Sequence, residues 1–227
     1  MNEDLDNARK LADLIVASLP KRIEIAALSL NSKLPFKALG LRELLIHRMA
    51  DLATAAVDLF YQKKAIPAVI ITRAAIETLS ILYALHEQTN EFLSEKNIPK
   101  FDDFLMKSSM GSRKNPDLPA PTNILTFIKK IEKDYPDFGF EFYYETLCEY
   151  THPNWAGTFG SYGLLDRDAL VLQLGPTERA NASNIGILAL CSTLEAFRFF
   201  YNSLSDPLLQ LNDYFEKQVP DSEDLTF

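Results

Sequence analysis

The chain has 227 residues, of which 47% are hydrophobic and 24% are charged. This length and composition predict one folded domain with its own core, and they exclude an intrinsically disordered protein. The formal net charge is −8, and the excess of acidic residues lies in 121–227, whereas 1–120 is nearly neutral. A protein that coats nucleic acid needs a basic face to displace counterions, so bulk DNA binding is excluded, while a small local anion site is not.

Cysteine content and apolar runs bear on the cellular compartment. The two cysteines, Cys148 and Cys191, do not make a disulfide framework, and the acidic N-terminus has no apolar signal core. The most apolar run, 65–85, carries Arg73 and Glu77 in its middle, so it predicts a buried core helix rather than a membrane span. We therefore expect a cytoplasmic protein without a membrane segment.

Apolar residues recur at helical spacing over most of the chain. The predicted helices are 3–19, 22–30, 41–64, 67–95, 122–133, 138–149, 177–204 and a short final helix from Asp206. The strongest are 41–64 and 67–95, whose short connection predicts an antiparallel central pair. We expect this pair to pack against 177–204, for which Thr177 is the predicted N-cap.

Residues 96–122 differ from the rest of the chain. They contain four prolines, and the cations Lys107, Arg113 and Lys114 stand there with no acidic residue between Asp103 and Asp117. This pattern predicts a long, mobile, locally basic loop.

One β element and one tail complete the predicted fold. Two apolar runs in 159–174 flank the turn 166–168, which predicts a β-hairpin. The acidic segment 221–227 is predicted to be a disordered tail. The expected fold is therefore an all-α helical bundle, a single domain over 1–220 with one small β-hairpin insertion.

The last long helix carries a stripe of small residues, which allows another helix to approach closely. The stripe consists of Ala182, Gly186, Ala189 and Thr193. Together with the hydrophobic bulk of the chain, it suggests a homodimer.

The first candidate for chemistry is the pair Arg73 and Glu77 inside the most apolar helix. Their spacing of four places them on one helix face, where they can pair. An isolated charge in such a setting costs several kcal/mol, so each needs a partner. One interpretation is a buried ion pair that holds the helix in register. The other is the floor of a polar pocket, in which Arg73 binds an anion.

The second candidate is the compact turn around His152, which includes Asn154 and Trp155. One of only three histidines sits here at a helix end, before the rigid Pro153. Such a histidine can act as a general base, an anion donor or a ligand. It can equally be part of a helix C-terminal cap.

Two acidic rows were considered as metal ligands. Glu141, Glu145 and Glu149 share one helix face, and His152 completes a Glu-x-x-His motif with Glu149, but no second copy of that motif is present. The row of Glu43, His47 and Asp51 is likewise unpaired. A solvated acidic face is the preferred interpretation, and we expect neither a metal nor a cofactor. Phosphate-binding glycine loops and nucleophile-elbow motifs are absent from the sequence.

An Arg-x-x-x-Glu core helix followed by a Thr-His-Pro turn resembles bacterial helical proteins related to the HEPN superfamily. The matched residues are Arg73, Glu77, Tyr83 and His152. The resemblance implies a compact helical bundle, often dimeric, of a kind linked to RNA cleavage, nucleotide binding and toxin or phage-defence systems. Active HEPN nucleases carry an arginine a few residues before the histidine, and no arginine stands between Glu145 and His152.

The resemblance and the residues together suggest a binding module whose enzymatic activity is left open. Its pocket would take a small anionic ligand, a nucleotide, a short RNA or a protein partner. The predicted ligand-binding residues are Arg73, Glu77, Tyr83, His152, Asn154 and Trp155. One alternative is an RNA-cleaving toxin or defence-type ribonuclease with His152 as base and Arg73 as phosphate clamp. Another is a metal-dependent hydrolase using Glu145, Glu149 and His152.

Overall fold

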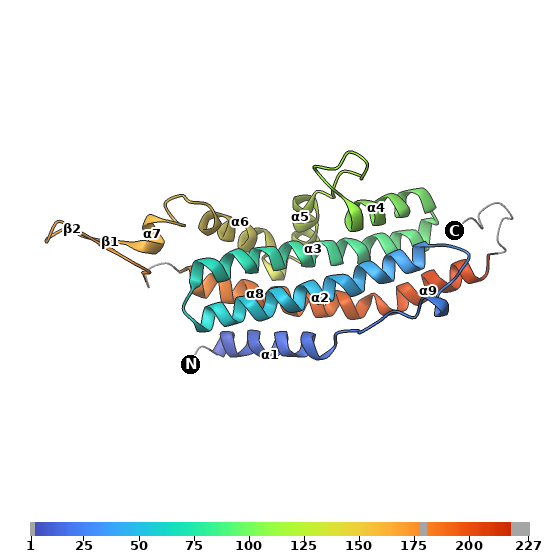
Figure 1. The fold of residues 1–227 in the computed structure, drawn as a ribbon, viewed down its shortest axis with the longest axis horizontal. Coiled ribbons are helices and arrows are strands. Elements are labelled where there is room, and N and C mark those ends of the chain that lie inside the picture. Colours follow the sequence, from blue (N-terminus) through green and yellow to red (C-terminus); the bar gives the residue numbers. More distant parts are fainter. Residues whose placement is uncertain (1–2, 178–180, 219–227) are drawn as a thin grey trace.

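Two long neighbouring helices, α2 (Leu34–Tyr61) and α3 (Ala65–Glu95), form the centre of the molecule. They run antiparallel and pack along their length, as predicted (Figure 1). Helix α2 begins seven residues before the predicted start, because Pro35 fits the first turn, where a missing N–H costs nothing. Lys63 adopts a left-handed conformation, with φ of 57°, in the short connection between the two helices.

The computed structural model describes residues 3–177 and 181–218, and the predicted tail 221–227 lies outside them. The remaining helices are α1 (Glu3–Ala17), α4 (Ile98–Met110), α5 (Ile124–Asp134), α6 (Phe140–Thr151), α7 (Phe159–Tyr162), α8 (Ala182–Ser203) and α9 (Ser205–Glu216). Helices α1, α2, α8 and α9 lie on one side of α3, and α4, α5 and α6 lie on the other (Figure 1). The all-α bundle with a single small β element is confirmed for the described residues.

The central position of α3 explains why this helix is apolar nearly all round. Helices on both sides cover it, and residues such as Ile76, Leu79 and Leu82 are fully buried. Helix α3 is the only described helix that is long and apolar enough to cross a membrane by length and composition alone, a property that it shares with the core helices of soluble bundles. In the bundle, half of that apolar stretch is buried against the protein itself.

The prediction of a loop over 96–122 is wrong for its first half, where helix α4 (Ile98–Met110) forms. The Asn97 side chain caps this helix by accepting a hydrogen bond from the Lys100 N–H, and Pro99 occupies the first turn. Its buried face consists of Phe101, Phe104 and Leu105. Proline was therefore a helix-start signal here rather than a loop signal.

The predicted helix 22–30 is also wrong. Only a short 3₁₀-helix, Ile25–Ala27, forms there, and none of its three residues is buried. A helix needs a face that packs against the core, and this segment has none.

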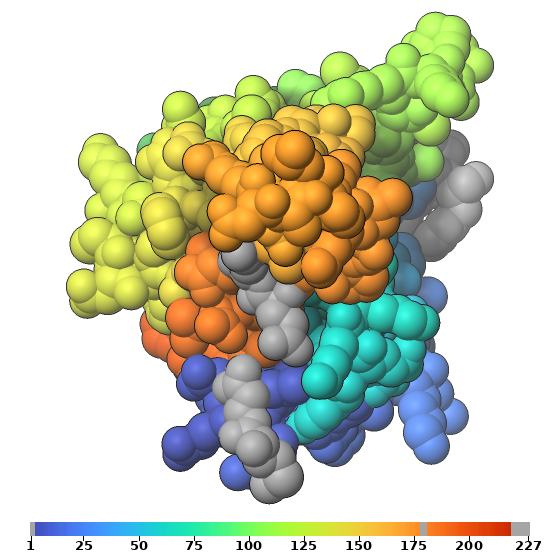
Figure 2. Space-filling model, turned by 90° about the vertical axis from the view of Figure 1, so that its left-hand side faces the viewer, coloured from blue at the N-terminus to red at the C-terminus, as the bar shows by residue number. Residues whose placement is uncertain are grey.

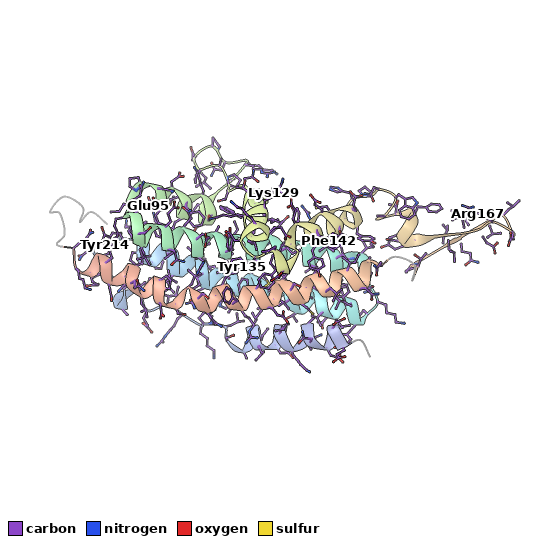
Figure 3. The ribbon with its side chains drawn as sticks, turned by 180° about the vertical axis from the view of Figure 1, so that it is seen from behind. Glu95, Lys129, Tyr135, Phe142, Arg167 and Tyr214 are labelled. Atoms are coloured by element: carbon purple, nitrogen blue, oxygen red, sulfur yellow. The ribbon has the colours of Figure 1, made fainter. Side chains whose placement is uncertain are left out.

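The predicted hairpin is present but shorter than expected. Strand β1 (Gly163–Asp166) pairs antiparallel with β2 (Val171–Leu174), so that Leu165 lies opposite Leu172. The Asp166 carboxylate closes the turn by accepting hydrogen bonds from the backbone N–H groups of Asp168 and Ala169. The hairpin projects beyond the bundle, stands in front of the helix ends in Figure 2, and carries Arg167 at its tip in Figure 3.

Helix α8 begins at Ala182, so the predicted N-cap at Thr177 is wrong. The Thr177 hydroxyl instead donates a 2.9 Å hydrogen bond to the Gly160 carbonyl, which ties this segment to α7. The small-residue stripe of α8 does permit close packing, as predicted. A Cβ built on Gly186 would lie 2.7 Å from Cζ of Phe60 on α2. The stripe is thus used inside the chain, and it no longer supports the predicted homodimer.

Candidate functional site

The polar cluster at the predicted site joins α3 to α6 through Arg73, Glu77 and Tyr144. Arg73 Nη2 lies 3.1 Å from Glu77 Oε1, as the spacing of four predicts. The same nitrogen donates a 2.8 Å hydrogen bond to the Tyr144 hydroxyl. That hydroxyl in turn donates to Glu77 Oε1 at 3.0 Å. The three side chains, which we call the Arg73 cluster, therefore close a small hydrogen-bonded triangle.

The Arg73 cluster is partly open to solvent and leaves one donor without a partner. The side chains of Arg73 and Glu77 are 29% and 27% exposed. Arg73 Nε is buried and has no hydrogen-bond partner among the described residues. A guanidinium carries five N–H donors in a fixed planar geometry, so holding one end leaves others available. Tyr144 adds a stacking contact, with its ring centroid 5.0 Å from Arg73 Cζ.

The neighbours of Arg73 in the cluster stabilise its charged form. Burial disfavours the charged guanidinium, but the hydrogen bond to Tyr144 and the nearby Glu77 outweigh it, so the pKa of Arg73 is raised. Burial also raises the pKa of Tyr144, and the hydrogen bond from Arg73 opposes this shift. Tyr144 therefore remains a neutral phenol that accepts from the cation and donates to the anion.

Tyr144 was not identified from the sequence. It lies on the buried face of α6 with Phe140 and Leu147, at helical spacing that is typical of core residues. The usable signal was the Arg73–Glu77 pair itself. Two charges on a buried helix require a polar group on the helix packed against them.

His152 is not part of the Arg73 cluster. It is exposed at the C-terminal end of α6, where its backbone N–H donates to the Cys148 carbonyl at 3.2 Å. Its imidazole has no hydrogen bond or ion pair among the described contacts. Eight residues separate it from Tyr144, which is about 12 Å along a helix axis.

Asn154 and Trp155 shape the turn after His152 in different ways. Asn154 donates a 2.7 Å hydrogen bond to Glu149 and accepts one of 3.0 Å from the Gly157 N–H. It therefore has a structural role in closing the turn. Trp155 is largely exposed.

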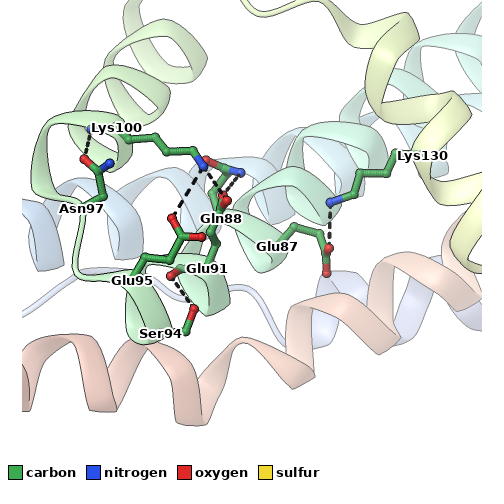
Figure 4. Close-up of polar contacts among 8 residues, drawn as sticks. All are labelled: Glu87, Gln88, Glu91, Ser94, Glu95, Asn97, Lys100 and Lys130. Atoms are coloured by element: carbon green, nitrogen blue, oxygen red, sulfur yellow. Dashed lines mark hydrogen bonds and ion pairs between the residues drawn. The ribbon is translucent and has the colours of Figure 1, made fainter.

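Tyr83 lies away from Arg73, in a second polar cluster between α3 and α5. Ten residues along α3 separate the two side chains, about 15 Å. The buried Tyr83 hydroxyl donates a short hydrogen bond to Asp134. Lys130 lies over the Tyr83 ring. Lys130 also pairs with Glu87 at 2.9 Å (Figure 4). These contacts give Tyr83 a role in holding α5 against α3.

The two acidic rows do not assemble into a metal site. Among residues 3–177 and 181–218, no group of three or more His, Cys, Asp or Glu side chains is placed to hold a metal ion. The Glu149 carboxylate accepts a hydrogen bond from Asn154, and Glu43 forms an ion pair with Arg42 at 2.9 Å. His47 Nε2 lies 2.8 Å from the Pro20 carbonyl instead.

The pair Arg42–Glu43 is the most buried ion pair described, and sequence reasoning missed it. The two side chains are only 12% and 11% exposed. The Tyr201 hydroxyl donates a 2.6 Å hydrogen bond to Glu43, and Arg42 Cζ lies 3.9 Å from the Tyr201 ring centroid. Arg42 also donates to the Tyr201 carbonyl and to Ser205. This network holds α2 against the α8–α9 junction, the role first considered for Arg73.

A cavity of about 350 Å³ lies between α1, α2 and α8, away from every predicted site residue. It is lined by Leu14, Ile15, Ala17, Ser18, Ile46, Phe197, Arg198, Tyr201 and Asn202. Its volume is within the range of small-molecule sites. Arg198 has no hydrogen-bond or ion-pair partner among the described contacts, so this cavity combines apolar walls with an available cation.

Comparisons of this chain with protein-family models, with curated proteins and with solved structures find no match. The HEPN resemblance therefore stays a prediction, and the functional argument depends on the geometry described above.

Proposed function

We propose that this chain is a cytoplasmic, HEPN-like helical binding module that holds a small anionic group at the Arg73 cluster. The ligand classes that fit are a nucleotide phosphate or the backbone of a short RNA. The observation that carries the proposal is a guanidinium that Glu77 and Tyr144 hold through Nη2, on a side chain that is 29% exposed and so presents donors to solvent.

The fixed orientation of Arg73 favours binding. Glu77 and Tyr144 hold one end of the guanidinium, so little side-chain entropy is lost when an anion contacts the free donors. Glu77 also neutralises much of the positive charge. We therefore expect modest affinity that depends on hydrogen-bond geometry more than on net charge.

The position of His152 favours binding over catalysis. A general base must lie within hydrogen-bond reach of the proton that it removes. His152 makes no described contact with the Arg73 cluster, and it lies about two helix turns beyond Tyr144. A ribonuclease that uses both residues would need the substrate to bridge this separation.

The proposal is tested by calorimetric titration of the full chain with AMP, with ATP and with a short RNA, at low salt. We compare the wild type with Arg73→Gln, with Arg198→Gln, which removes the cation of the cavity, and with Arg22→Gln. Arg22 is a solvent-exposed arginine paired with Glu24, so it is the matched control. We expect at least a tenfold loss of affinity in Arg73→Gln only, about 1.4 kcal/mol.

Other outcomes reject the proposal. No binding of any of these ligands, or equal binding by the wild type and Arg73→Gln, removes the Arg73 site. A loss confined to Arg198→Gln places the ligand in the cavity instead.

The two enzymatic alternatives have separate tests. RNA cleavage by the wild type that is lost in His152→Ala would replace the binding module with a ribonuclease. Stoichiometric metal in the purified protein, lost on substitution of Glu145 or Glu149, would favour the hydrolase.

A further inference from the structure

The projecting end of the molecule exposes an unusual amount of apolar side chain. Eight large apolar residues there are each between 41% and 87% exposed. They are Trp155, Phe159, Tyr162, Leu165, Leu170, Val171, Leu172 and Leu174. We call this set the hairpin patch. Scattered exposed apolar residues are normal on a protein surface, whereas a contiguous group of this size marks an interaction surface.

The hairpin patch is continuous from the turn after α6 to β2. Trp155 ring atoms come within 3.2 Å of a Cβ built on Gly160. A Cβ built on Gly163 would lie 3.5 Å from side-chain atoms of both Phe159 and Leu172. The aromatic residues of α7 and the aliphatic residues of the hairpin therefore lie side by side around these two glycines.

The hairpin is a two-stranded sheet, with β1 and β2 paired only to each other among the described residues. A two-stranded hairpin in water is marginal in stability unless further strands or a packed face support it. All four residues of β2 are exposed, and no charged residue or proline occurs between Ala169 and Leu174. Natural sheet edges are usually protected by such residues. The outer edge of β2 is thus free to pair.

We propose that β2 pairs with β2 of a second copy of this chain, which makes a four-stranded antiparallel sheet across a two-fold axis. Antiparallel pairing of identical strands is self-complementary, so the interface closes at a dimer. The proposal is independent of the Arg73 site.

Charge favours a second copy at this particular surface. Two chains that each carry a formal net charge of −8 repel one another, and the acidic excess lies in 121–227, the half of the sequence that contains the hairpin. The stretch from Ala169 to Leu174 is uncharged, so two copies can approach there without placing like charges opposite each other.

The available area also suits a dimer. A fully buried aromatic side chain covers about 150–250 Å², so three partly exposed aromatic and five aliphatic side chains present several hundred Å². A standard interface buries about 800 Å² on each partner. The hairpin patch can therefore supply part of one side of such an interface.

A charge exchange at Leu172 tests the proposal. This residue lies near the middle of β2, and so near the proposed two-fold axis. Leu172→Lys and Leu172→Glu each place two like charges close together in a homodimer, whereas a one-to-one mixture places opposite charges there. Leu44→Lys is the matched control, because Leu44 is an exposed leucine on α2, far from the hairpin.

Masses are measured by sedimentation velocity on the full chain at concentrations up to about 100 μM. A dimer with a dissociation constant of about 1 μM would be almost fully formed at that concentration. We expect a dimer for the wild type and for Leu44→Lys, at least a tenfold weaker dimer for each Leu172 variant, and recovery in the mixture. Helical circular dichroism should be the same for every variant, because the hairpin lies outside the bundle.

Three results would overturn the proposal. The first is a wild type that stays monomeric over the whole concentration range. The second is a dimer that persists in both Leu172 variants. The third is a mixture that remains monomeric, which would mean that the two strands do not meet.

Discussion

Gly186 of α8 lies directly against Phe60 of α2, so closely that a single added methyl group would stand 2.7 Å from the ring. Gly186→Ala gains about 1 kcal/mol of helix propensity, but forcing a methyl group into a packed core costs about 1–3 kcal/mol. We expect a net loss of about 1 kcal/mol in the free energy of unfolding, measured by urea denaturation with far-UV circular dichroism.

Gly40 provides the matched control for this substitution. It lies within α2, and a Cβ built there meets nothing within 4 Å. Gly40→Ala should therefore stabilise the protein by about 0.5–1 kcal/mol. Equal effects of the two substitutions would contradict the close contact between α8 and α2.

Tyr144→Phe tests the Arg73 cluster without changing its shape. The hydroxyl donates to Glu77 and accepts from Arg73, and removal leaves these two charges with only each other. We expect the free energy of unfolding to fall by about 1 kcal/mol, since both charged groups retain partial access to water. Tyr143 neighbours Tyr144 on α6, and its hydroxyl has no described hydrogen bond. Tyr143→Phe should be nearly neutral, and a comparable loss there would argue against the triangle.

Glu43→Ala should be the most destabilising charge deletion among those considered. Removal of Glu43 leaves the buried Arg42 without its carboxylate and the Tyr201 hydroxyl without its acceptor. Breaking a buried ion pair costs about 3 kcal/mol. Glu24→Ala breaks the exposed pair with Arg22 and should cost less than about 0.5 kcal/mol. Urea denaturation of the two variants decides whether burial separates them.

Stability should fall in alkaline solution because folding raises the pKa of several tyrosines, most of all that of the buried Tyr83 and that of the partly buried Tyr201. Burial, and next the hydrogen bond to a carboxylate, raise the pKa of Tyr83 and of Tyr201. In the unfolded chain a tyrosine titrates near pH 10. Above that pH the unfolded state releases protons that the folded state retains, so stability is complete below about pH 10 and falls as the pH rises. The slope is about 1.4 kcal/mol per pH unit for each tyrosine.

The measurement is the free energy of unfolding of the wild type and of Tyr201→Phe between about pH 9 and pH 11. The variant lacks one of the hydroxyls whose pKa is raised in the folded state, so its stability should decline less steeply over this range. Parallel curves would mean that Tyr201 does not contribute to the pH dependence.

The parts of the fold that were predictable are those with strong local patterns. The apolar stripes of 41–64 and 67–95 extend over many turns, and their short connection leaves few arrangements for the two helices. Helix α4 was not predicted because proline occurs both in loops and in the first turn of a helix. Only the burial of Phe101 distinguishes the two cases for Pro99. The prediction of Thr177 as an N-cap was wrong because its hydroxyl donates to the Gly160 carbonyl, a tertiary contact that no local pattern specifies.

The candidate site was predictable in part for the same reason. The pair Arg73 and Glu77 follows from helix spacing alone, and the structure contains it. Tyr144 depends on which face of α6 meets α3, which no local pattern specifies. His152 and Tyr83 were included in the predicted site. In the structure, His152 is exposed at the end of α6 and Tyr83 contacts Asp134 of α5. Separation along a helix thus decided which of the predicted residues can act together.

The short connection between α2 and α3 has a kinetic consequence. These two helices can pair after closing only a three-residue link, whereas α8 can reach α3 only by closing a loop of 86 residues, 96–181. We therefore expect the α2–α3 pair to form in the folding transition state and α8 to dock late. Substitutions such as Ala53→Gly would then slow folding, and Ala189→Gly would mainly speed unfolding, which stopped-flow kinetics can distinguish.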